Sequence, residues 1–495
     1  MLRDLLPLLR CPYCGGAMHL KREVESDVER IRYGLLACRC FEFPIVDGVP
    51  LLSLAKGYGG AEEELQPYVP LQVAAINHLQ RNDVSGLRAW ITRHLPLAAA
   101  LMEGRFGSYL EFSAAMSAQL DLAIMRYLGR YEVLGVAPRR GWRDLARRVY
   151  QGYQRYQGLR GAALPAALPP AERAQLNSYF VGRFFAPRVN ALALELEQLP
   201  LEGRLLSLCC GQGVYENLLL SLGGQRTLVS IDGQFLNLLC TRQFIHPQGV
   251  YFCHDVQFPL PFVDGAFNGV FSSTCLPEIP AQRSFVCEAI RVTADTGWTF
   301  FDSIWNLDMA GARRVDESRY YRFCQNFFTH LEDYLDFFTE CGGPDRSIAL
   351  DVPDLPVRYL NEPRWITERS AILEAVRAKT DDQISVLVTK PGRFGSFRQA
   401  PHKWFSTETL AVSPVFDVAP ANGALRLTRK PAFAKLPPNF APKSFAAYPE
   451  RLSLERARLN EPNYRLEQFC ASVFVPLPKR FARDTQSLAS LLAKV

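Results

Sequence analysis

The stretch GRLLSLCCGQGVYENLLLSL (203–222) determines the fold class of this chain. It has the pattern of a hydrophobic strand, a turn that carries Gly211 and Gly213, and a helix. A second hydrophobic strand, TLVSID (227–232), follows and ends in Asp232. Strands that alternate with helices predict a parallel sheet, and glycines in the first turn let the backbone approach a ligand closely. The sequence therefore predicts a doubly wound α/β sheet with a ligand site at the carboxyl ends of its strands.

Further strands follow in the same alternation. VYFCHD (250–255) ends at Asp255, and FNGVFSST (267–274) and WTFFDSIW (298–305) are separated by a predicted helix. Asp232 lies about 20 residues after the glycine turn, where a carboxylate can accept hydrogen bonds from a ribose diol. The pattern therefore favours a nucleoside-containing ligand.

These motifs and their order resemble class I S-adenosylmethionine (SAM)-dependent methyltransferases over residues 186–391. The matching pieces are LLSLCCGQG (205–213), VSIDGQ (229–234), CHDVQFPLPFVDGAFNGVFSS (253–273) and AIRVTADTGWTFF (289–301). The helical stretch FFTHLEDYLDFFTECG (327–342) and a last strand, ISVLVTKP (384–391), complete the resemblance. It implies a Rossmann-like methyltransferase domain that binds SAM.

The resemblance also implies a set of cofactor-binding residues: Ser207, Cys209, Gly211, Gly213, Asp232, Gly233, Asp255, Val256 and Ser272. In this assignment the two glycines pack against the methionine and sugar, and Asp232 holds the ribose hydroxyls. Asp255 meets the adenine amino group and Val256 packs on the ring. Residues 272–274 lie beneath the methyl-bearing sulfur, where contacts to the acceptor arise.

The first motif departs from the family at two positions. Ser207 stands where the family has an acid, and Cys209 stands where it has the first glycine. Loss of a charge-assisted hydrogen bond is worth ~1.5–3 kcal/mol, so the serine weakens the expected cofactor site. A catalytically inactive methyltransferase-like scaffold or binding protein is therefore one alternative.

No catalytic residue can be assigned from the sequence. His254, Glu278 and His330 are candidate bases, and each is more simply interpreted as structural. Cys275, like Cys209, is interpreted as a small apolar filler. The Asn/Asp-Pro-Pro-aromatic motif of nucleic-acid amino methylation is absent after the fourth strand, where SSTCLPEIP (272–280) stands.

The first 55 residues predict a zinc ribbon. Cys11, Cys14, Cys38 and Cys40 form two close pairs that suit a structural tetrahedral zinc. The alternatives are a ribbon that has lost its metal and a metal site in which His19 replaces one of the cysteine ligands. FPIVDGVP (43–50) after the cysteine pairs resembles the small zinc-ribbon activators of tRNA and protein methyltransferases, which implies a ribbon that docks in cis on the methyltransferase domain.

Two other segments lack a recognisable family. Residues 56–185 have helical periodicity that suits packing or a lid, with a Pro/Ala/Gly connector at 158–170. Residues 392–495 are rich in proline and aromatics. From 391 onward the chain has 16 Lys or Arg and 7 Asp or Glu, a net of +9 against +6 for the whole chain. This tail is either a nucleic-acid surface or an extended arm on the protein's own body.

Length and composition limit the remaining interpretations. A chain of 495 residues with 48% hydrophobic and 21% charged residues predicts two to four globular units. No apolar run reaches the ~18–20 residues that span a bilayer, and the start does not resemble a signal peptide. We therefore expect a cytoplasmic protein without membrane contact, in which the 13 cysteines are mostly thiols or metal ligands.

The sequence thus predicts a SAM-dependent methyltransferase with a structural zinc. Its acceptor is undetermined, with a small molecule or peptide slightly favoured. RNA is the alternative acceptor, because ribosomal-RNA guanine methyltransferases resemble the layout of a ribbon followed by a methyltransferase domain. A separate protein partner also stays open.

Overall fold

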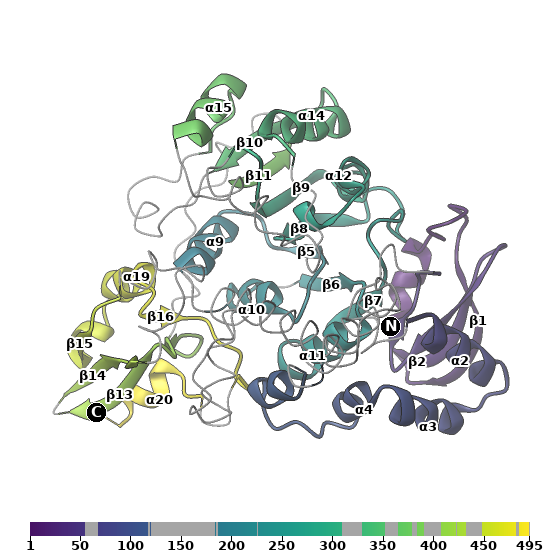
Figure 1. The fold of residues 1–495 in the computed structure, drawn as a ribbon, viewed down its shortest axis with the longest axis horizontal. Coiled ribbons are helices and arrows are strands. Elements are labelled where there is room, and N and C mark those ends of the chain that lie inside the picture. Colours follow the sequence, from purple (N-terminus) through teal and green to yellow (C-terminus); the bar gives the residue numbers. More distant parts are fainter. Residues whose placement is uncertain are drawn as a thin grey trace, which may run out of the picture.

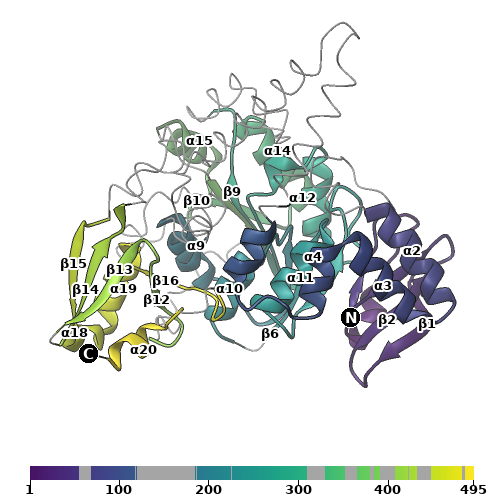
Figure 2. The same cartoon turned by 60° about the horizontal axis from the view of Figure 1, so that its bottom comes forward.

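The computed structural model describes residues 1–54, 68–116, 119, 184, 187–224, 226–308, 329–351, 365–378, 384–390, 407–421, 423–431, 448–481 and 485–494. A central sheet has helices on both faces, and the N-terminal strands and the C-terminal strands lie on opposite flanks of it (Figures 1 and 2). In these ranges no helix is long and apolar enough to cross a membrane.

The central sheet has seven strands in the order β10-β11-β9-β8-β5-β6-β7. Strands β5 to β9 are parallel, and β11 is antiparallel to both β9 and β10. Their bounds are β5 (Gly203–Leu208), β6 (Arg226–Asp232), β7 (Val250–Cys253), β8 (Phe267–Ser273), β9 (Thr293–Ile304), β10 (Ser347–Asp351) and β11 (Ile384–Thr389). The chain runs outward from β5 to β7 and then returns to β8 beside β5. Ligands bind at such a switch point in open α/β sheets.

Helices cover both faces because the parallel strands are apolar on both sides. One face carries α9 (Pro187–Glu197), α10 (Val214–Ser221) and α11 (Phe235–Phe244), whose leucines share a core with Leu205 and Leu228. The other face carries α12 (Gln282–Arg291) and α14 (Leu331–Gly342). The doubly wound α/β fold predicted from the sequence is confirmed.

The N-terminal unit is a small antiparallel sheet followed by helices. It contains η1 (Arg3–Leu8), β1 (His19–Ser26), β2 (Ile31–Ala37), β3 (Glu42–Val46) and β4 (Val49–Pro50) in that order. Helices α2 (Tyr68–Gln80), α3 (Val84–His94) and α4 (Pro96–Met102) continue from it, and residues 109–116 are also helical. The predicted connector at 158–170 lies outside the described residues.

The C-terminal unit is folded, so the extended arm considered for the tail is wrong for its described residues. A three-stranded sheet of β13 (Phe416–Ala421), β14 (Ala424–Arg429) and β15 (Arg451–Glu455) lies beside the pair β12 (Ala411–Val412) and β16 (Phe474–Val475). Three short helices belong to the same unit: α18 (Arg456–Leu459), α19 (Pro462–Cys470) and α20 (Leu488–Leu492). A further helix, α15 (Arg369–Ala378), lies before β11 of the central sheet. Leu425 and Leu427 alternate with exposed residues, which gives the small sheet one buried face.

Candidate functional site

The glycine turn lies at the carboxyl end of β5. Gly211 and Gly213 have φ angles of 54° and 82°, in the left-handed region that favours glycine. A Cβ at Gly213 would lie 2.5 Å from the Thr241 Cγ2 atom of α11. Gly213 is therefore needed for the close packing of two helices, in addition to the ligand contact expected from the sequence.

Asp232 joins the second motif to the glycine turn. One carboxylate oxygen accepts a hydrogen bond from Gly211 N at 2.8 Å, and the other accepts from Gln234 N at 2.8 Å and Asn237 Nδ2 at 3.2 Å. A Cβ at the neighbouring Gly233 would have no other atom closer than 4.0 Å. Asp232 and Gly211 are thus brought together beside a glycine whose missing side chain would just touch the backbone of residues 254–255.

Asp255 and Val256 follow β7, the strand next to β6. The main-chain N–H of Asp255 donates to Ser53 Oγ at 2.6 Å, and its carboxylate accepts from Gln257 N at 3.1 Å. Gly233 lies directly opposite, since the added Cβ would be 4.0 Å from Asp255 Cα. The two predicted acids therefore flank one edge of the sheet, and the N-terminal unit contributes Ser53 to that edge.

The carboxyl end of β8 belongs to a buried polar cluster that the sequence did not predict. Asp302 of β9 accepts hydrogen bonds from Ser273 Oγ at 2.6 Å, Ser303 Oγ at 2.7 Å and Ser385 Oγ at 3.1 Å. Ser385 also lies 3.2 Å from the carboxylate of Glu195 in α9. Only the register of three strands brings these residues together, because they are up to 190 positions apart in the chain.

Ser272 precedes Ser273 in β8 but does not take part in the hydrogen bonds of this cluster. Its side chain is 1% exposed, and its hydroxyl has no hydrogen-bond partner among the described residues. Ser272 and Ser273 face opposite sides of the sheet because side chains alternate along a strand. The predicted acceptor edge therefore presents one satisfied and one unsatisfied serine.

Three non-glycine residues with positive φ mark the same edge. Cys209, Thr274 and Ser303 have φ angles of 56°, 59° and 64°. They lie at the ends of β5, β8 and β9, which are adjacent in the sheet. Such conformations cost energy and gather at functional sites, so this edge is the best candidate for ligand contact.

Cys209 and Cys275 form a disulfide across the gap between β5 and β8, with their Cα atoms 6.2 Å apart. Their interpretation as apolar fillers is therefore wrong. The cause is tertiary, since the switch point places the ends of β5 and β8 side by side although 66 residues separate the cysteines. A second disulfide joins Cys287 of α12 to Cys341 of α14. The described free cysteines are Cys11, Cys14, Cys38, Cys40, Cys210, Cys240, Cys253 and Cys470.

The candidate bases have structural surroundings. His254 is fully buried, with Nε2 at 3.1 Å from the Pro259 carbonyl oxygen and Nδ1 at 3.3 Å from Ser53 Oγ. Burial lowers the pKa of His254 to about 4, so the ring is neutral near pH 7. Its single N–H must then donate to the Pro259 carbonyl, and Nδ1 accepts from Ser53. His330 is exposed at the start of α14 and contacts Asp308, and Glu278 is exposed.

The four N-terminal cysteines do come together. Their sulfur atoms all lie within 4.8 Å of one another, and His19 is not part of the group. Main-chain N–H groups of Tyr13, Cys40 and Phe41 approach the sulfurs at 3.3–3.4 Å. A zinc ion with ~2.3 Å bonds to four sulfurs would need sulfurs ~3.8 Å apart, so this donor set fits a tetrahedral metal.

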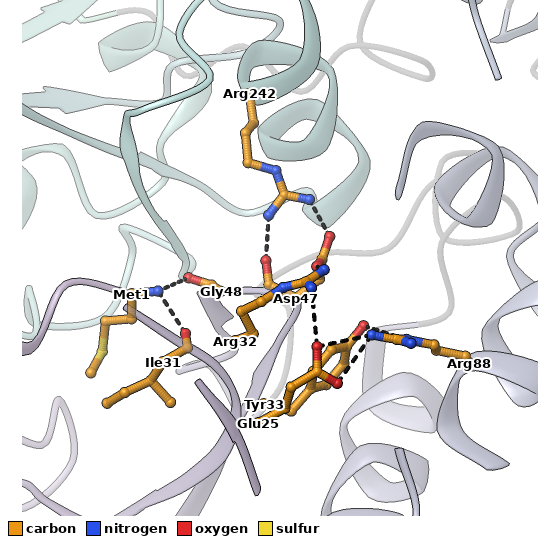
Figure 3. A network of polar contacts seen from close by, with 9 residues as sticks. All are labelled: Met1, Glu25, Ile31, Arg32, Tyr33, Asp47, Gly48, Arg88 and Arg242. Carbon is orange, nitrogen blue, oxygen red and sulfur yellow. Dashed lines mark hydrogen bonds and ion pairs between the residues drawn. The ribbon is translucent and has the colours of Figure 1, made fainter. Parts of the chain in front are cut away.

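The N-terminal unit contacts the central sheet through a backbone bridge and an ion pair. Leu51 pairs with Cys253 of β7 in parallel, and Leu52 N donates to Cys253 O at 2.9 Å. Arg242 of α11 binds both the main-chain oxygen and the carboxylate of Asp47 (Figure 3). Arg32 also holds this carboxylate, at 2.9 Å. α11 therefore contacts the N-terminal unit at Arg242 and the glycine turn at Thr241.

Figure 3 shows that this ion pair belongs to a wider network. Arg32 and Arg88 both contact the Glu25 carboxylate, at 3.0 and 3.2 Å. The amino group of Met1 donates to the Ile31 and Gly48 carbonyls. Asp47 is thus held in a network that spans β1, β2, α3 and α11.

Comparison with known proteins agrees with this geometry. Residues 206–301 match the family model of a methyltransferase domain. The match begins in β5 and ends in β9, and so covers the glycine turn, Asp232, Asp255 and the end of β8. Strands β5 to β9 of the central sheet therefore match a methyltransferase domain, and the flanking units lie outside the match. No curated protein matches the chain.

Solved structures similar to this chain are methyltransferases at low identity. A SAM-dependent methyltransferase from Thermotoga maritima has 14% identity and a TM-score of 0.31, over 49% of this chain and 97% of that chain. A complex of the Haloferax volcanii Trm112 methyltransferase activator with a methyltransferase has 16% identity and a TM-score of 0.31, over 43% and 92%. Haemonchus contortus phosphoethanolamine N-methyltransferase 2 has 14% identity and a TM-score of 0.30, over 44% and 59%. At these values the similarity carries no argument about the function of this chain.

Proposed function

We propose that this protein is a SAM-dependent methyltransferase that acts on a small molecule or peptide. The observation that carries the proposal is the family match over residues 206–301, which covers β5 to β9 and the turns between them. Asp232, Gly211 and Asp255 meet at the carboxyl edge of β5, β6 and β7, where open α/β sheets bind ligands.

Each half of this edge has a separate task in the proposal. Asp232 would hold the ribose hydroxyls and Asp255 the adenine amino group, with Gly233 leaving room between them. When bound, SAM supplies a methyl group on a sulfonium that is already activated, so the protein mainly has to position and desolvate the reactants. The ends of β8 and β9 would hold the acceptor, through Ser272 and the cluster around Asp302.

Three arginines of the tail support a small acceptor over RNA, because each is engaged within the protein. Arg480 donates to the carbonyls of Phe106 and Gln243, Arg465 donates to Leu459, and the Arg458 guanidinium stacks on Tyr464. These cations are engaged within the protein. A nucleic-acid surface needs basic groups that are free to meet phosphates.

Binding of S-adenosylhomocysteine, measured by calorimetry, tests the proposal. The unmodified protein should bind it, and Asp232→Ala should weaken binding at least about tenfold, because a charged hydrogen-bond acceptor is lost. Asp264→Ala is the matched control, since this acid is exposed and pairs with Arg291 away from the edge. No binding at millimolar ligand would reject the proposal and leave the scaffold interpretation.

We propose further that Cys11, Cys14, Cys38 and Cys40 hold a structural zinc. Four thiols in reach of one point leave no open position for a substrate, which is typical of structural rather than catalytic zinc. The metal would substitute for the small core of the N-terminal unit.

A further inference from the structure

Glu216 is a buried carboxyl group without a cation. It lies in the first turn of α10, directly after the glycine turn, and its side chain is fully buried. One oxygen accepts from Ser230 Oγ at 3.1 Å, and the other has no hydrogen-bond partner among the described residues. It forms no ion pair within the same ranges. A buried carboxylate without a cation is costly, so a role beyond packing is expected.

The carboxyl of Glu216 lies on the same face of the sheet as Asp232. Ser207 and Ser230 are paired neighbours in β5 and β6, and Asp232 follows Ser230 by two residues, so all three side chains face α10. Burial raises the pKa of Glu216 to about 7, the nearby Ser207 hydroxyl opposes the rise, and the charge of Asp232 adds to it. The two acids are therefore electrostatic neighbours at the cofactor edge.

Ser207 is the position where the first motif lacks its expected acid. The structure supplies a carboxyl next to that serine from the helix instead of from the strand. We propose that Glu216 takes over the missing charge and, together with Ser207, binds the α-ammonium group of the cofactor's methionine part. This inference rests on the proposed function, and it assigns a residue to the part of the cofactor that the sequence left without a charged partner.

Charge and position support this assignment together. Asp232, at the end of β6, suits the ribose diol. Glu216 lies beside Ser207 and Ser230, further from the strand ends, and its carboxyl has no cation in the described part of the chain, so it suits an ammonium group. A bound cation stabilises the ionised form of a neighbouring carboxyl. Ligand binding should therefore drive the Glu216 proton into the buffer.

Two ligands separate this role from general cofactor binding. S-adenosylhomocysteine carries the ammonium group, and 5′-methylthioadenosine has the same nucleoside without the amino acid. Glu216→Gln should weaken S-adenosylhomocysteine binding by about 10- to 100-fold, the effect of one charge-assisted hydrogen bond. Binding of 5′-methylthioadenosine should change less than about twofold, which also reports that the nucleoside site is intact. Adding Ser207→Asp to Glu216→Gln should restore much of the lost affinity.

Proton release by the unmodified protein gives a second readout that needs no variant. Calorimetry in buffers of different ionisation enthalpy should show nearly one proton released per S-adenosylhomocysteine at pH 6. The release should fall to almost none at pH 8, where Glu216 is already ionised. 5′-Methylthioadenosine should release none at either pH.

The possible results are distinguishable. If the unmodified protein binds neither ligand, the proposed function fails and this inference fails with it. If both ligands bind but Glu216→Gln weakens them equally or not at all, Glu216 is not the ammonium partner while the proposed function stands.

Discussion

The N-terminal sheet with its cysteine cluster (residues 1–54, the proposed ribbon) and the C-terminal unit (the described parts of 407–494) pack against the central sheet from opposite flanks, and their contacts differ in kind (Figure 1). The ribbon is joined by a backbone bridge to β7 and by the charged group Asp47–Arg242. The C-terminal unit is joined by neutral amides and by Arg480, whose guanidinium contacts only neutral groups of α11 and its surroundings. Asn190 of α9 donates to the Phe469 and Phe474 carbonyls, and Asn217 of α10 donates to Pro476.

This difference has a consequence for each joint. Burial raises the pKa of the Asp47 carboxyl, but Arg242 and Arg32 outweigh that effect and the net pKa lies below its usual value. The ribbon joint also contains His254, which must stay neutral to accept from Ser53. The amide side chains of Asn190 and Asn217, which join the C-terminal unit, do not titrate. The ribbon joint should therefore respond to metal, charge and pH, whereas the C-terminal joint should depend on hydrogen bonds and packing alone.

The largest effect should come from removal of the proposed metal ligands. Cys11→Ser with Cys14→Ser should abolish metal binding and unfold the ribbon, because small metal domains fold only with their ion. Metal content per chain and hydrogen exchange in β2 measure this. Cys470→Ser, a buried cysteine of the C-terminal unit, is the control and should leave the metal in place. Full metal retention in the double variant would disprove the ligand assignment.

Loss of the ion pair should have the next largest effect. Arg242→Ala leaves the buried Asp47 with one cation, and breaking a buried pair costs about 3 kcal/mol. Hydrogen exchange in β2 should therefore speed up more than a hundredfold, with β14 unchanged. Arg480→Ala is the matched control, since this exposed guanidinium also contacts α11, at Gln243 and Phe244, but meets only neutral groups there. Equal effects of the two variants in β2 would contradict the comparison.

Acidification should loosen the ribbon joint by a smaller amount. His254 has a pKa of about 4 in the folded protein and 6.5 as its ordinary value. Between these values the unfolded chain binds a proton that the folded chain does not, so stability is full above pH 6.5 and falls as the pH is lowered. The loss at pH 5 should be ~2 kcal/mol. Hydrogen exchange in β2 and β14, corrected for intrinsic pH dependence, should show the loss in β2 alone.

The smallest effect should come from one neutral bond of the C-terminal joint. Asn217→Ala removes a single hydrogen bond to the Pro476 carbonyl and should cost about 1 kcal/mol. Exchange in β14 should rise about fivefold at both pH 5 and pH 7. An effect that changed with pH would mean that a titrating group also holds this joint.

The parallel sheet, its strands and the meeting of four cysteines could be predicted from the sequence. Hydrophobic runs, glycine turns and cysteine spacing are local signals, and the helical periodicity of the described parts of 56–185 agrees with α2 to α4. The Asp302 cluster could not be predicted in this way, because Ser273, Ser385 and Glu195 meet only through strand register. The fold of the tail was also missed, since its strands are short and lie among prolines.

The sequence by itself determined which elements form and which chemical groups they carry, including the two departures at Ser207 and Cys209. The tertiary structure decided what those departures mean. The switch point between β5 and β8 places Cys209 against Cys275, and the packing of α10 on the sheet places Glu216 beside Ser207. The physical reason is that propensity and periodicity act within a few residues, whereas charge compensation and thiol pairing depend on which distant side chains packing brings within a few ångströms.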